Sequence, residues 1–188
     1  SSVDLKIQTL AGMIYAYVRG DQVKVNLTPP KDFKMNIPVA VNGRTLHVNF
    51  INTGVPHAVI FAQGLSSMQI VDLGRQIRYH KVFAPRGTNV DFVEVSGEHY
   101  VSIRTYERGV EDETLACGTG SVAGALVTGY TLAQNAGLKP QGPVEKSFQV
   151  QTRGGEILKV YFTLDGAAFS DVWLEGRANV VYKGVWYV

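Results

Sequence analysis

The chain of 188 residues contains a single cysteine, Cys117. One thiol excludes an internal disulfide framework and a zinc site built from several thiolates. An unpaired cysteine that must stay a thiol is typical of a reducing compartment, so we expect the protein to be cytoplasmic.

The sequence also lacks a large excess of charge of one sign and a long apolar run. The 18 basic and 16 acidic residues give a formal net charge of +2, and no basic run or interleaved aromatic platform is present. Nucleic-acid binding is therefore not expected. No stretch approaches the roughly 20 apolar residues of a membrane helix, and no signal peptide is visible, so no membrane partner is expected. The chain opens without an initiator methionine, which predicts a processed product or a fragment.

The composition and length of the sequence are those of one globular domain. Hydrophobic residues make up 45% and charged residues 18% of the chain, and this length suits one buried core. No repeat and no low-complexity linker is present. Alternating residues predict strands over 5–9, 13–18 and 23–27, and Pro29-Pro30 predicts a loop through Lys34. Asn42-Gly43 between two apolar runs predicts a hairpin of residues 37–41 and 45–50.

Two helices are expected among further strands. Ser66 or Ser67 is a candidate N-cap for a helix to about residue 80. The second helix is expected from Cys117 or Gly118 to about residue 135, apolar around most of its circumference and therefore buried on nearly all sides. Gly137 is its candidate C-cap. The remaining strands are expected at 57–61, 89–95, 100–106 and within 148–188.

These elements predict an α+β fold, with a mixed or largely antiparallel sheet wrapped around the buried central helix. Cys117 is expected at the start of that helix, where free backbone N–H groups and the helix dipole stabilise a thiolate. The alternative is a small buried side chain without chemistry. The glycines that follow favour a functional thiol, because they let a ligand carboxylate approach the backbone closely.

The turn Gly118-Thr119-Gly120-Ser121 is not expected to bind nucleotides. A phosphate loop needs a lysine before its serine or threonine, and a dinucleotide fingerprint needs a strand directly before its first glycine. Neither condition is met, because acidic residues at 111–113 precede the turn.

The polar residues elsewhere have two interpretations each. Glu107 and Arg108 are either a solvated pair at a strand end or a clamp for the ammonium and carboxylate of a zwitterion. His57 is either a core or loop histidine or a proton acceptor near the thiol. Asn52 and Asn89 are either turn residues or residues that bind a ligand.

Three motifs in order resemble the diaminopimelate epimerase family. The segment Tyr106-Glu107-Arg108-Gly109 through Leu115-Ala116-Cys117-Gly118-Thr119-Gly120 is similar to the family's second cysteine motif. Asn52-Thr53-Gly54-Val55-Pro56-His57 resembles its histidine-bearing loop. Pro85-Arg86-Gly87-Thr88-Asn89-Val90 resembles the segment that supplies a substrate-binding asparagine. The resemblance spans nearly the whole chain.

This resemblance implies an isomerase that interconverts LL- and meso-diaminopimelate, for lysine and peptidoglycan precursor synthesis, without a cofactor or metal. In the family one cysteine thiolate removes the α-proton while a second thiol protonates the opposite face. Each of two similar domains supplies one cysteine at the start of a central helix.

Carried onto this sequence, the resemblance implies that Cys117, Glu107 and His57 are catalytic. It implies substrate contacts by the residues Asn52, Asn89, Glu107, Arg108, Gly118 and Thr119. Glu107 and Arg108 contact the α-amino and α-carboxylate groups, and the backbone N–H groups of Gly118 and Thr119 bind the carboxylate. Val55 replaces the family's usual asparagine, and Asn52 is the candidate to replace that contact. Glu111-Asp112 replaces a single glycine of many members and lengthens the loop.

The family's first cysteine motif and its domain are absent from this sequence. The resemblance assigns residues 1–26 to strands that pack into that missing domain, 27–176 to the second epimerase domain, and 177–188 to a terminal strand of the first. We therefore expect a carboxyl-terminal portion that carries one of two thiols and is inactive alone. Its expected partners are diaminopimelate and the missing first domain; a homodimer is compatible with the sequence.

Two other functions are kept as alternatives. One is a related amino-acid racemase or epimerase of the proline or hydroxyproline type. The other is a non-catalytic ligand-binding remnant domain.

Overall fold

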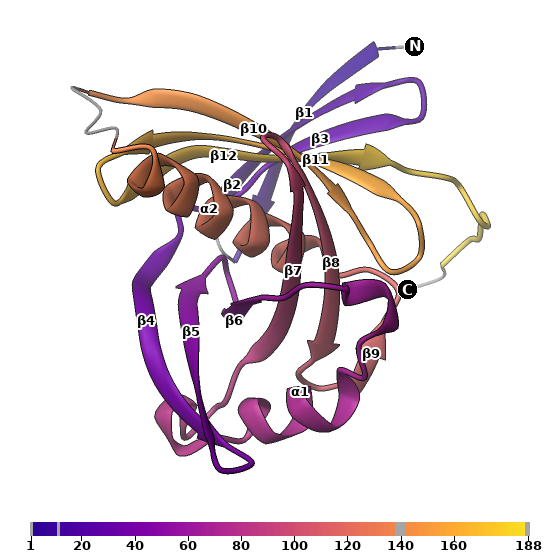
Figure 1. Cartoon of the computed structure of the whole chain (residues 1–188). Helices are drawn as coiled ribbons and strands as arrows, with labels where there is room; N and C mark the ends of the chain where they lie inside the picture. The colour runs from indigo at the N-terminus through magenta and orange to yellow at the C-terminus, as the bar shows by residue number, and fades with distance from the viewer. Residues whose placement is uncertain (1, 11, 138–141, 187–188) are drawn as a thin grey trace.

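One large mixed sheet and two α-helices make up the computed structural model, which describes residues 2–10, 12–137 and 142–186 and confirms the predicted α+β class (Figure 1). The helices are α1 (Val71–Arg78) and α2 (Gly118–Asn135), and the 3-10 turns are η1 (Leu65–Ser67) and η2 (Lys81–Phe83). The strands in the described residues are β1 (Ser2–Thr9), β2 (Gly12–Arg19), β3 (Gln22–Asn26), β4 (Lys31–Val41), β5 (Arg44–Asn52), β6 (Pro56–Phe61), β7 (Asn89–Gly97), β8 (Tyr100–Glu107), β9 (Asp112–Thr114), β10 (Val144–Gln151), β11 (Ile157–Asp165) and β12 (Ala168–Arg177).

The sheet curves around α2, as the sequence predicted. Its strand order is β1-β2-β3-β12-β11-β10-β8-β7-β6-β5-β4, and β9 pairs with β8 outside this path. The pairs β6–β7 and β8–β10 are parallel and the others antiparallel. In Figure 1, β10, β11 and β12 arch over α2 while β4 to β8 descend beside it.

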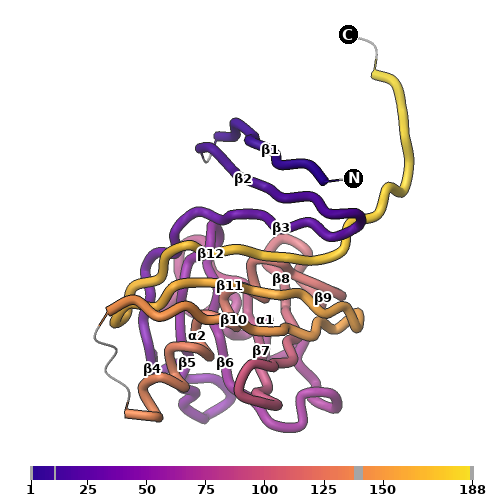
Figure 2. The backbone as a smooth tube through the Cα atoms, turned by 90° about the horizontal axis from the view of Figure 1, so that it is seen from above, coloured from indigo at the N-terminus to yellow at the C-terminus, as the bar shows by residue number. Residues whose placement is uncertain are grey.

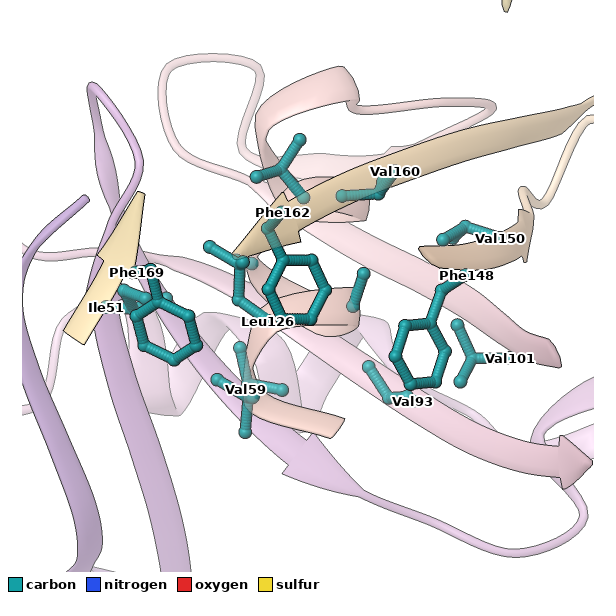
Figure 3. Close-up of a cluster of buried hydrophobic side chains, with 14 of the residues drawn as sticks. Ile51, Val59, Val93, Val101, Leu126, Phe148, Val150, Val160, Phe162 and Phe169 are labelled. Carbon is teal, nitrogen blue, oxygen red and sulfur yellow. The ribbon is translucent and has the colours of Figure 1, made fainter. Parts of the chain in front are cut away.

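Helix α2 is buried because apolar residues surround it on nearly every side. Most of its residues from Gly120 to Gly129 are inaccessible, and its neighbours come from both parts of the curved sheet. Phe148 and Phe162 stack at 6.2 Å between ring centroids and lie against this helix, as Figure 3 shows. Gly124 and Gly129 let the strands approach it, since a Cβ at Gly129 would lie 2.6 Å from Phe162.

The opposite face of β4 to β8 carries a second core under α1. Because side chains alternate along a strand, Val59 and Val93 face α2 while Ala58 and Phe92 face α1. This part of the sheet therefore lies between the two helices, with α1 on one face and α2 on the other.

The expected hairpin is confirmed, with a longer first strand. Asn42 and Gly43 have φ values of 52° and 71°, as a two-residue hairpin turn requires. The loop expected through Lys34 is wrong, because β4 already begins at Lys31 and pairs with Asn52. Two register irregularities let this edge strand absorb residues with positive φ.

The helix expected from Ser66 or Ser67 begins later than predicted, at Val71. Glu94 accepts hydrogen bonds from the N–H groups of Gly64 and Leu65 at 2.6 and 3.2 Å. Arg104 donates to the carbonyl groups of Leu65 and Met68 at 2.8 and 2.6 Å. These tertiary bonds hold η1 as a single 3-10 turn, and α1 starts only after Ile70.

The ends of the chain differ from expectation in a further way. Residues 178–186 form no strand, so the strands expected to residue 188 stop at Arg177; Tyr187 and Val188 lie outside the described residues. The second helix is confirmed at Gly118–Asn135, and Gly137 follows its Ala136 C-cap with a φ of 63°. Left-handed glycine just beyond a helix end is a common terminator.

Strands β1, β2 and β3 extend the sheet beyond the core (Figure 2). Every residue of β1 is exposed. Cross-strand register puts aliphatic side chains on one face of these strands: Val3, Leu5, Ile7, Ile14, Ala16, Val18, Val23 and Val25. A β face of this composition is apolar enough to need a partner.

Candidate active site

The alternation of side chains on β6, β7 and β8 places polar groups beside the start of α2. His57 precedes Val59 by two residues, and Asp91 precedes Val93 by two, so both face α2 as those valines do. Thr105 lies directly across from Asp91 in the antiparallel β7–β8 pair. The alternation of side chains that places the valines in the core therefore also brings these polar side chains together.

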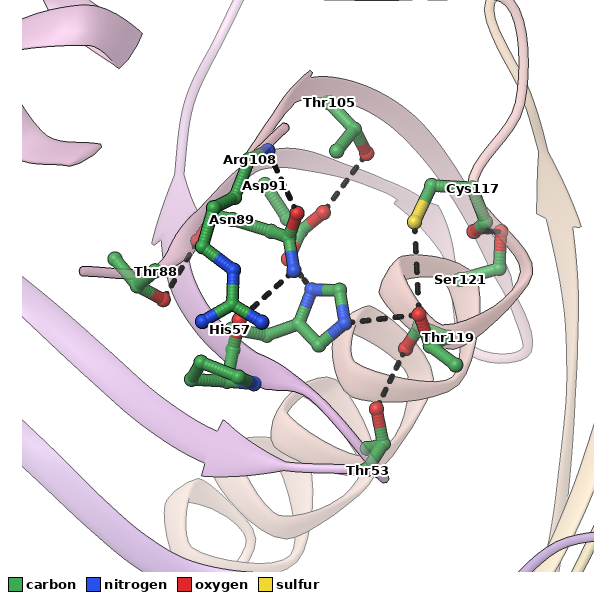
Figure 4. Close-up of polar contacts among 11 residues, drawn as sticks. Thr53, His57, Thr88, Asn89, Asp91, Thr105, Arg108, Cys117, Thr119 and Ser121 are labelled. Atoms are coloured by element: carbon green, nitrogen blue, oxygen red, sulfur yellow. Dashed lines mark hydrogen bonds and ion pairs between the residues drawn. The ribbon is translucent and has the colours of Figure 1, made fainter. Parts of the chain in front are cut away.

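A continuous chain of hydrogen bonds joins five of these side chains, as Figure 4 shows. Thr105 donates to Asp91 Oδ1 at 2.8 Å. Asp91 Oδ2 lies 2.7 Å from His57 Nδ1, and His57 Nε2 lies 3.0 Å from the Thr119 hydroxyl. That hydroxyl is 3.6 Å from the sulfur of Cys117. The structure thus brings His57, Thr119 and Cys117 together, a proximity that sequence alone did not establish.

Cys117 is the N-cap residue of α2 and is partly exposed. Burial raises the pKa of its thiol to about 11, and the charges of Asp91 and Glu107 act in the same direction. A hydrogen bond from the Gly120 backbone N–H opposes this effect without reversing it, as does the Thr119 hydroxyl whenever it donates to the sulfur. The raised pKa runs against the stabilisation of a thiolate that the helix start predicted.

Glu107 and Arg108 end β8 next to this network. Glu107 occupies the position two residues after Thr105 and so points to the same face. Within the described residues, neither the Glu107 carboxylate nor the Arg108 guanidinium has a hydrogen-bond or ion-pair partner. Two unpaired opposite charges at the end of β8 are available to a zwitterionic ligand.

Asn89 is buried and its amide is already engaged within the protein. Its Nδ2 donates to the Pro56 carbonyl at 3.0 Å, and its Oδ1 accepts the Arg108 N–H at 2.8 Å. The side chain thus ties the loop before His57 to the end of β8. Its substrate contact stays a prediction; what the structure adds is a positioning role.

The remaining predicted residues lie at the edges of the site. Asn52 ends β5, and its Oδ1 accepts the Gly54 N–H at 3.1 Å, an arrangement typical of an asparagine turn. Gly118 and Thr119 are the first residues of α2, where backbone N–H groups lack helical acceptors. Those groups remain candidates for binding a carboxylate.

Sequence reasoning missed Asp91, Thr105, Thr53 and Ser121. Thr53 donates to the Thr119 carbonyl at 3.0 Å, and Ser121 donates to the Cys117 carbonyl at 3.0 Å. Asp91 had a visible signal, because it is a carboxylate between Val90 and Phe92 in the apolar part of a predicted strand. No group of three or more His, Cys, Asp or Glu residues in the described parts of the chain could hold a metal ion.

The sequence profile described as diaminopimelate epimerase matches residues 49–178, which contain every residue of this site. The chain belongs to the diaminopimelate epimerase family. Diaminopimelate epimerases are isomerases, as the word epimerase states. The predicted family is therefore confirmed.

Curated diaminopimelate epimerases are similar along nearly the whole chain. The enzyme from Aquifex aeolicus is 42% identical over 182 residues, which cover 96% of this chain and 61% of that protein. The diaminopimelate epimerase from Hydrogenobaculum sp. is also 42% identical, over 97% of this chain and 62% of that protein. The chain thus spans about three fifths of the length of these diaminopimelate epimerases.

Solved structures confirm the fold. A hydroxyproline epimerase from Agrobacterium vitis, with bound trans-4-hydroxy-L-proline, superimposes with a TM-score of 0.70 at 17% identity, over 94% of this chain and 56% of that one. A probable proline racemase from Agrobacterium radiobacter gives a TM-score of 0.68 at 15% identity, over 97% of this chain and 61% of that one. At these identities the likeness shows the fold of this chain and nothing about its substrate.

No helix in the described part of this epimerase-family chain has the length and apolar character needed to cross a membrane.

Proposed function

We propose that this chain supplies one of two opposed proton-transfer thiols to an epimerase that interconverts LL- and meso-diaminopimelate. The observation that carries the proposal is the hydrogen-bonded series from Asp91 through His57 and Thr119 to Cys117, at the start of a buried helix. Membership of the diaminopimelate epimerase family supports the substrate.

The proposed reaction moves one proton on each face of the α-carbon. A thiolate on one face removes the α-proton, and a thiol on the other face donates its proton to the resulting carbanion. No cofactor is required, because the two sulfur atoms and the electrostatics of the site carry the whole change. Cys117 is one of these groups, and its partner belongs to a domain outside this chain.

The charged residues beside Cys117 suit the binding of an amino acid. Arg108 binds the α-carboxylate and Glu107 the α-ammonium group, and the first N–H groups of α2 add donors to the carboxylate. Binding both charged groups fixes the α-carbon near the sulfur. That position is what proton transfer requires.

Exposed apolar side chains near both ends of the chain support the proposal of a second domain. On the aliphatic face of β1, β2 and β3 the side chains of Val3, Leu5 and Ile7 are at least 40% exposed, and those of Val180, Val181, Tyr182, Val185 and Trp186 are each at least 77% exposed. Apolar groups in these numbers stabilise a protein only when covered. We assign both segments to packing against the first domain, which carries the second thiol of the proposed mechanism.

The direct test is α-proton exchange in heavy water with LL-diaminopimelate. The intact enzyme is expected to exchange and epimerise, and the 188-residue chain alone is expected not to. Efficient epimerisation by the chain alone would contradict the two-thiol mechanism. Proline and trans-4-hydroxyproline serve as comparison substrates, and a preference for either would favour a racemase of that type. Specific binding of diaminopimelate by the intact enzyme, without exchange, would favour a ligand-binding domain.

Cys117→Ser tests the thiol itself. In the intact enzyme this substitution is expected to reduce kcat by about 10³-fold or more, because an alcohol is a far weaker acid than a thiol. Ser170→Ala, on the exposed surface of β12, is the matched control and should leave the rate unchanged. Wild-type turnover by Cys117→Ser would remove Cys117 from the mechanism.

A further inference from the structure

We propose that Asp91 is a positioning residue that fixes the tautomer of His57 and, through the Thr119 hydroxyl, holds Cys117 in its thiol form, so that Cys117 is the proton donor of the resting site. The inference rests on the function proposed above. It starts from the inaccessible pair of Asp91 and His57, both of whose side chains are 0% exposed.

Because the Asp91 carboxylate can only accept hydrogen bonds, the donors at His57 and Thr119 can be assigned. A carboxylate only accepts hydrogen bonds, so the hydrogen between Asp91 Oδ2 and His57 Nδ1, 2.7 Å apart, belongs to the imidazole. We take His57 as the neutral imidazole, which then has a lone pair on Nε2. The Thr119 hydroxyl, 3.0 Å from Nε2, must therefore donate to it.

The same assignment reaches the sulfur of Cys117. A hydroxyl has one hydrogen, and that of Thr119 is used at His57. The oxygen atom consequently presents a lone pair toward Sγ at 3.6 Å, where it accepts an S–H and repels a thiolate. The raised pKa of Cys117 agrees in direction; burial is its main cause and the Asp91 charge its second.

The site holds Asp91 in place from two further sides. Thr105 on β8 donates to its other carboxylate oxygen at 2.8 Å. On α2, a Cβ at Gly120 would lie 2.5 Å from Oδ1, so only glycine leaves room for this approach. The other charged group facing Cys117 is Glu107 on β8, which also disfavours a thiolate.

The proton transfer that follows is balanced. The S–H bond of Cys117 breaks as a C–H bond forms at the α-carbon, and the negative charge of the carbanion passes to sulfur. The original α-proton rests on the opposed thiol of the first domain. Rotation of the Thr119 hydroxyl from His57 toward the new thiolate then stabilises the product state.

The experiment combines histidine-ring ¹⁵N NMR with alkylation of Cys117 by iodoacetamide, located by mass spectrometry, on the intact enzyme. Wild-type His57 is expected to carry its hydrogen on Nδ1. Asp91→Asn keeps the shape but presents an amide donor, so the hydrogen should move to Nε2. Cys117 alkylation at pH 8 should rise about tenfold, the equivalent of one pKa unit. Thr105→Val is the matched control; it preserves the carboxylate and should preserve the tautomer.

Each outcome decides the proposal. An Nε2–H tautomer in the wild-type spectrum overturns it, whether or not Asp91→Asn folds. So does Asp91→Asn protein with an unchanged tautomer or an unchanged alkylation rate. Absence of α-proton exchange in the wild-type enzyme would instead reject the proposed function, while the NMR result still decides the role of Asp91.

Discussion

Arg78 holds Glu111 through two hydrogen bonds to one carboxylate oxygen, from Nε at 3.1 Å and from Nη2 at 2.9 Å. Its Nη1 also donates to the Arg86 carbonyl at 3.3 Å. One guanidinium on α1 therefore joins the segment that leads to Asn89 with the loop between Arg108 and Cys117. The two loops that border the active site share this anchor.

Arg78→Met should loosen both loops. The side chain is 13% exposed, so loss of its charge-assisted hydrogen bonds should lower the free energy of unfolding by about 1.5–3 kcal/mol in urea. In the intact enzyme KM should rise more than kcat falls, since binding groups lose their positions. Lys159→Met removes an exposed ion pair and is the control, with an expected change below about 1 kcal/mol. Equal effects of the two substitutions would refute the anchor.

Gly129→Ala should destabilise the protein although alanine is the better helix former. The gain in helix propensity is about 1 kcal/mol. The added methyl group would meet the Phe162 and Phe148 rings, and overpacking costs about 1–3 kcal/mol. Gly97→Ala places a methyl group where the nearest atom is 3.8 Å away and is the matched control. Urea unfolding of both variants measures the difference; a more stable Gly129→Ala protein would contradict the packing described.

Asn89→Ala should reduce both stability and substrate binding. The substitution leaves the buried Pro56 carbonyl and the Arg108 N–H without their partner, at a cost of about 1–3 kcal/mol for each group. Because Arg108 is displaced, KM for diaminopimelate should rise. Thermal unfolding and steady-state kinetics check the two effects. An unchanged melting temperature would show that Asn89 has no positioning role.

Alkylation of Cys117 should depend steeply on pH. Only the thiolate reacts, and burial places the pKa of this thiol at about 11. The rate should therefore increase about tenfold for each pH unit from 7 to 10, without the plateau that a free cysteine of pKa about 8.5 approaches. Free cysteine measured in parallel is the control. A plateau below pH 9 would mean that the folded chain stabilises the thiolate.

Local signals in the sequence predicted the features that local chemistry decides. The Asn42-Gly43 hairpin and the buried helix that starts after Cys117 follow from turn geometry and from a continuous apolar circumference. The motif that contains Glu107, Arg108 and Cys117 predicted the family. Each of these signals lies within a short stretch of chain.

The features that were missed depend on contacts between distant residues. Nothing near Asp91 in the sequence indicates that it bonds to His57, because only the parallel register of β6 and β7 brings the two together. The divided helix at 65–78 depends on Glu94 and Arg104 from other strands. The raised pKa of Cys117 likewise reflects burial and a neighbouring charge that a helix-start argument does not include.

The inward positions of β6, β7 and β8 have a consequence for how such enzymes diversify. His57, Asp91 and Thr105 lie on the same strand faces as Val59, Val93 and Ile103, so a slip of one residue would expose the core and dismantle the site together. Selection for stability thus also preserves the positions of His57, Asp91 and Thr105. Insertions and deletions in the connecting loops leave that register intact, so the loops can change in length and sequence while the hydrogen bond between His57 and Asp91 is inherited unchanged.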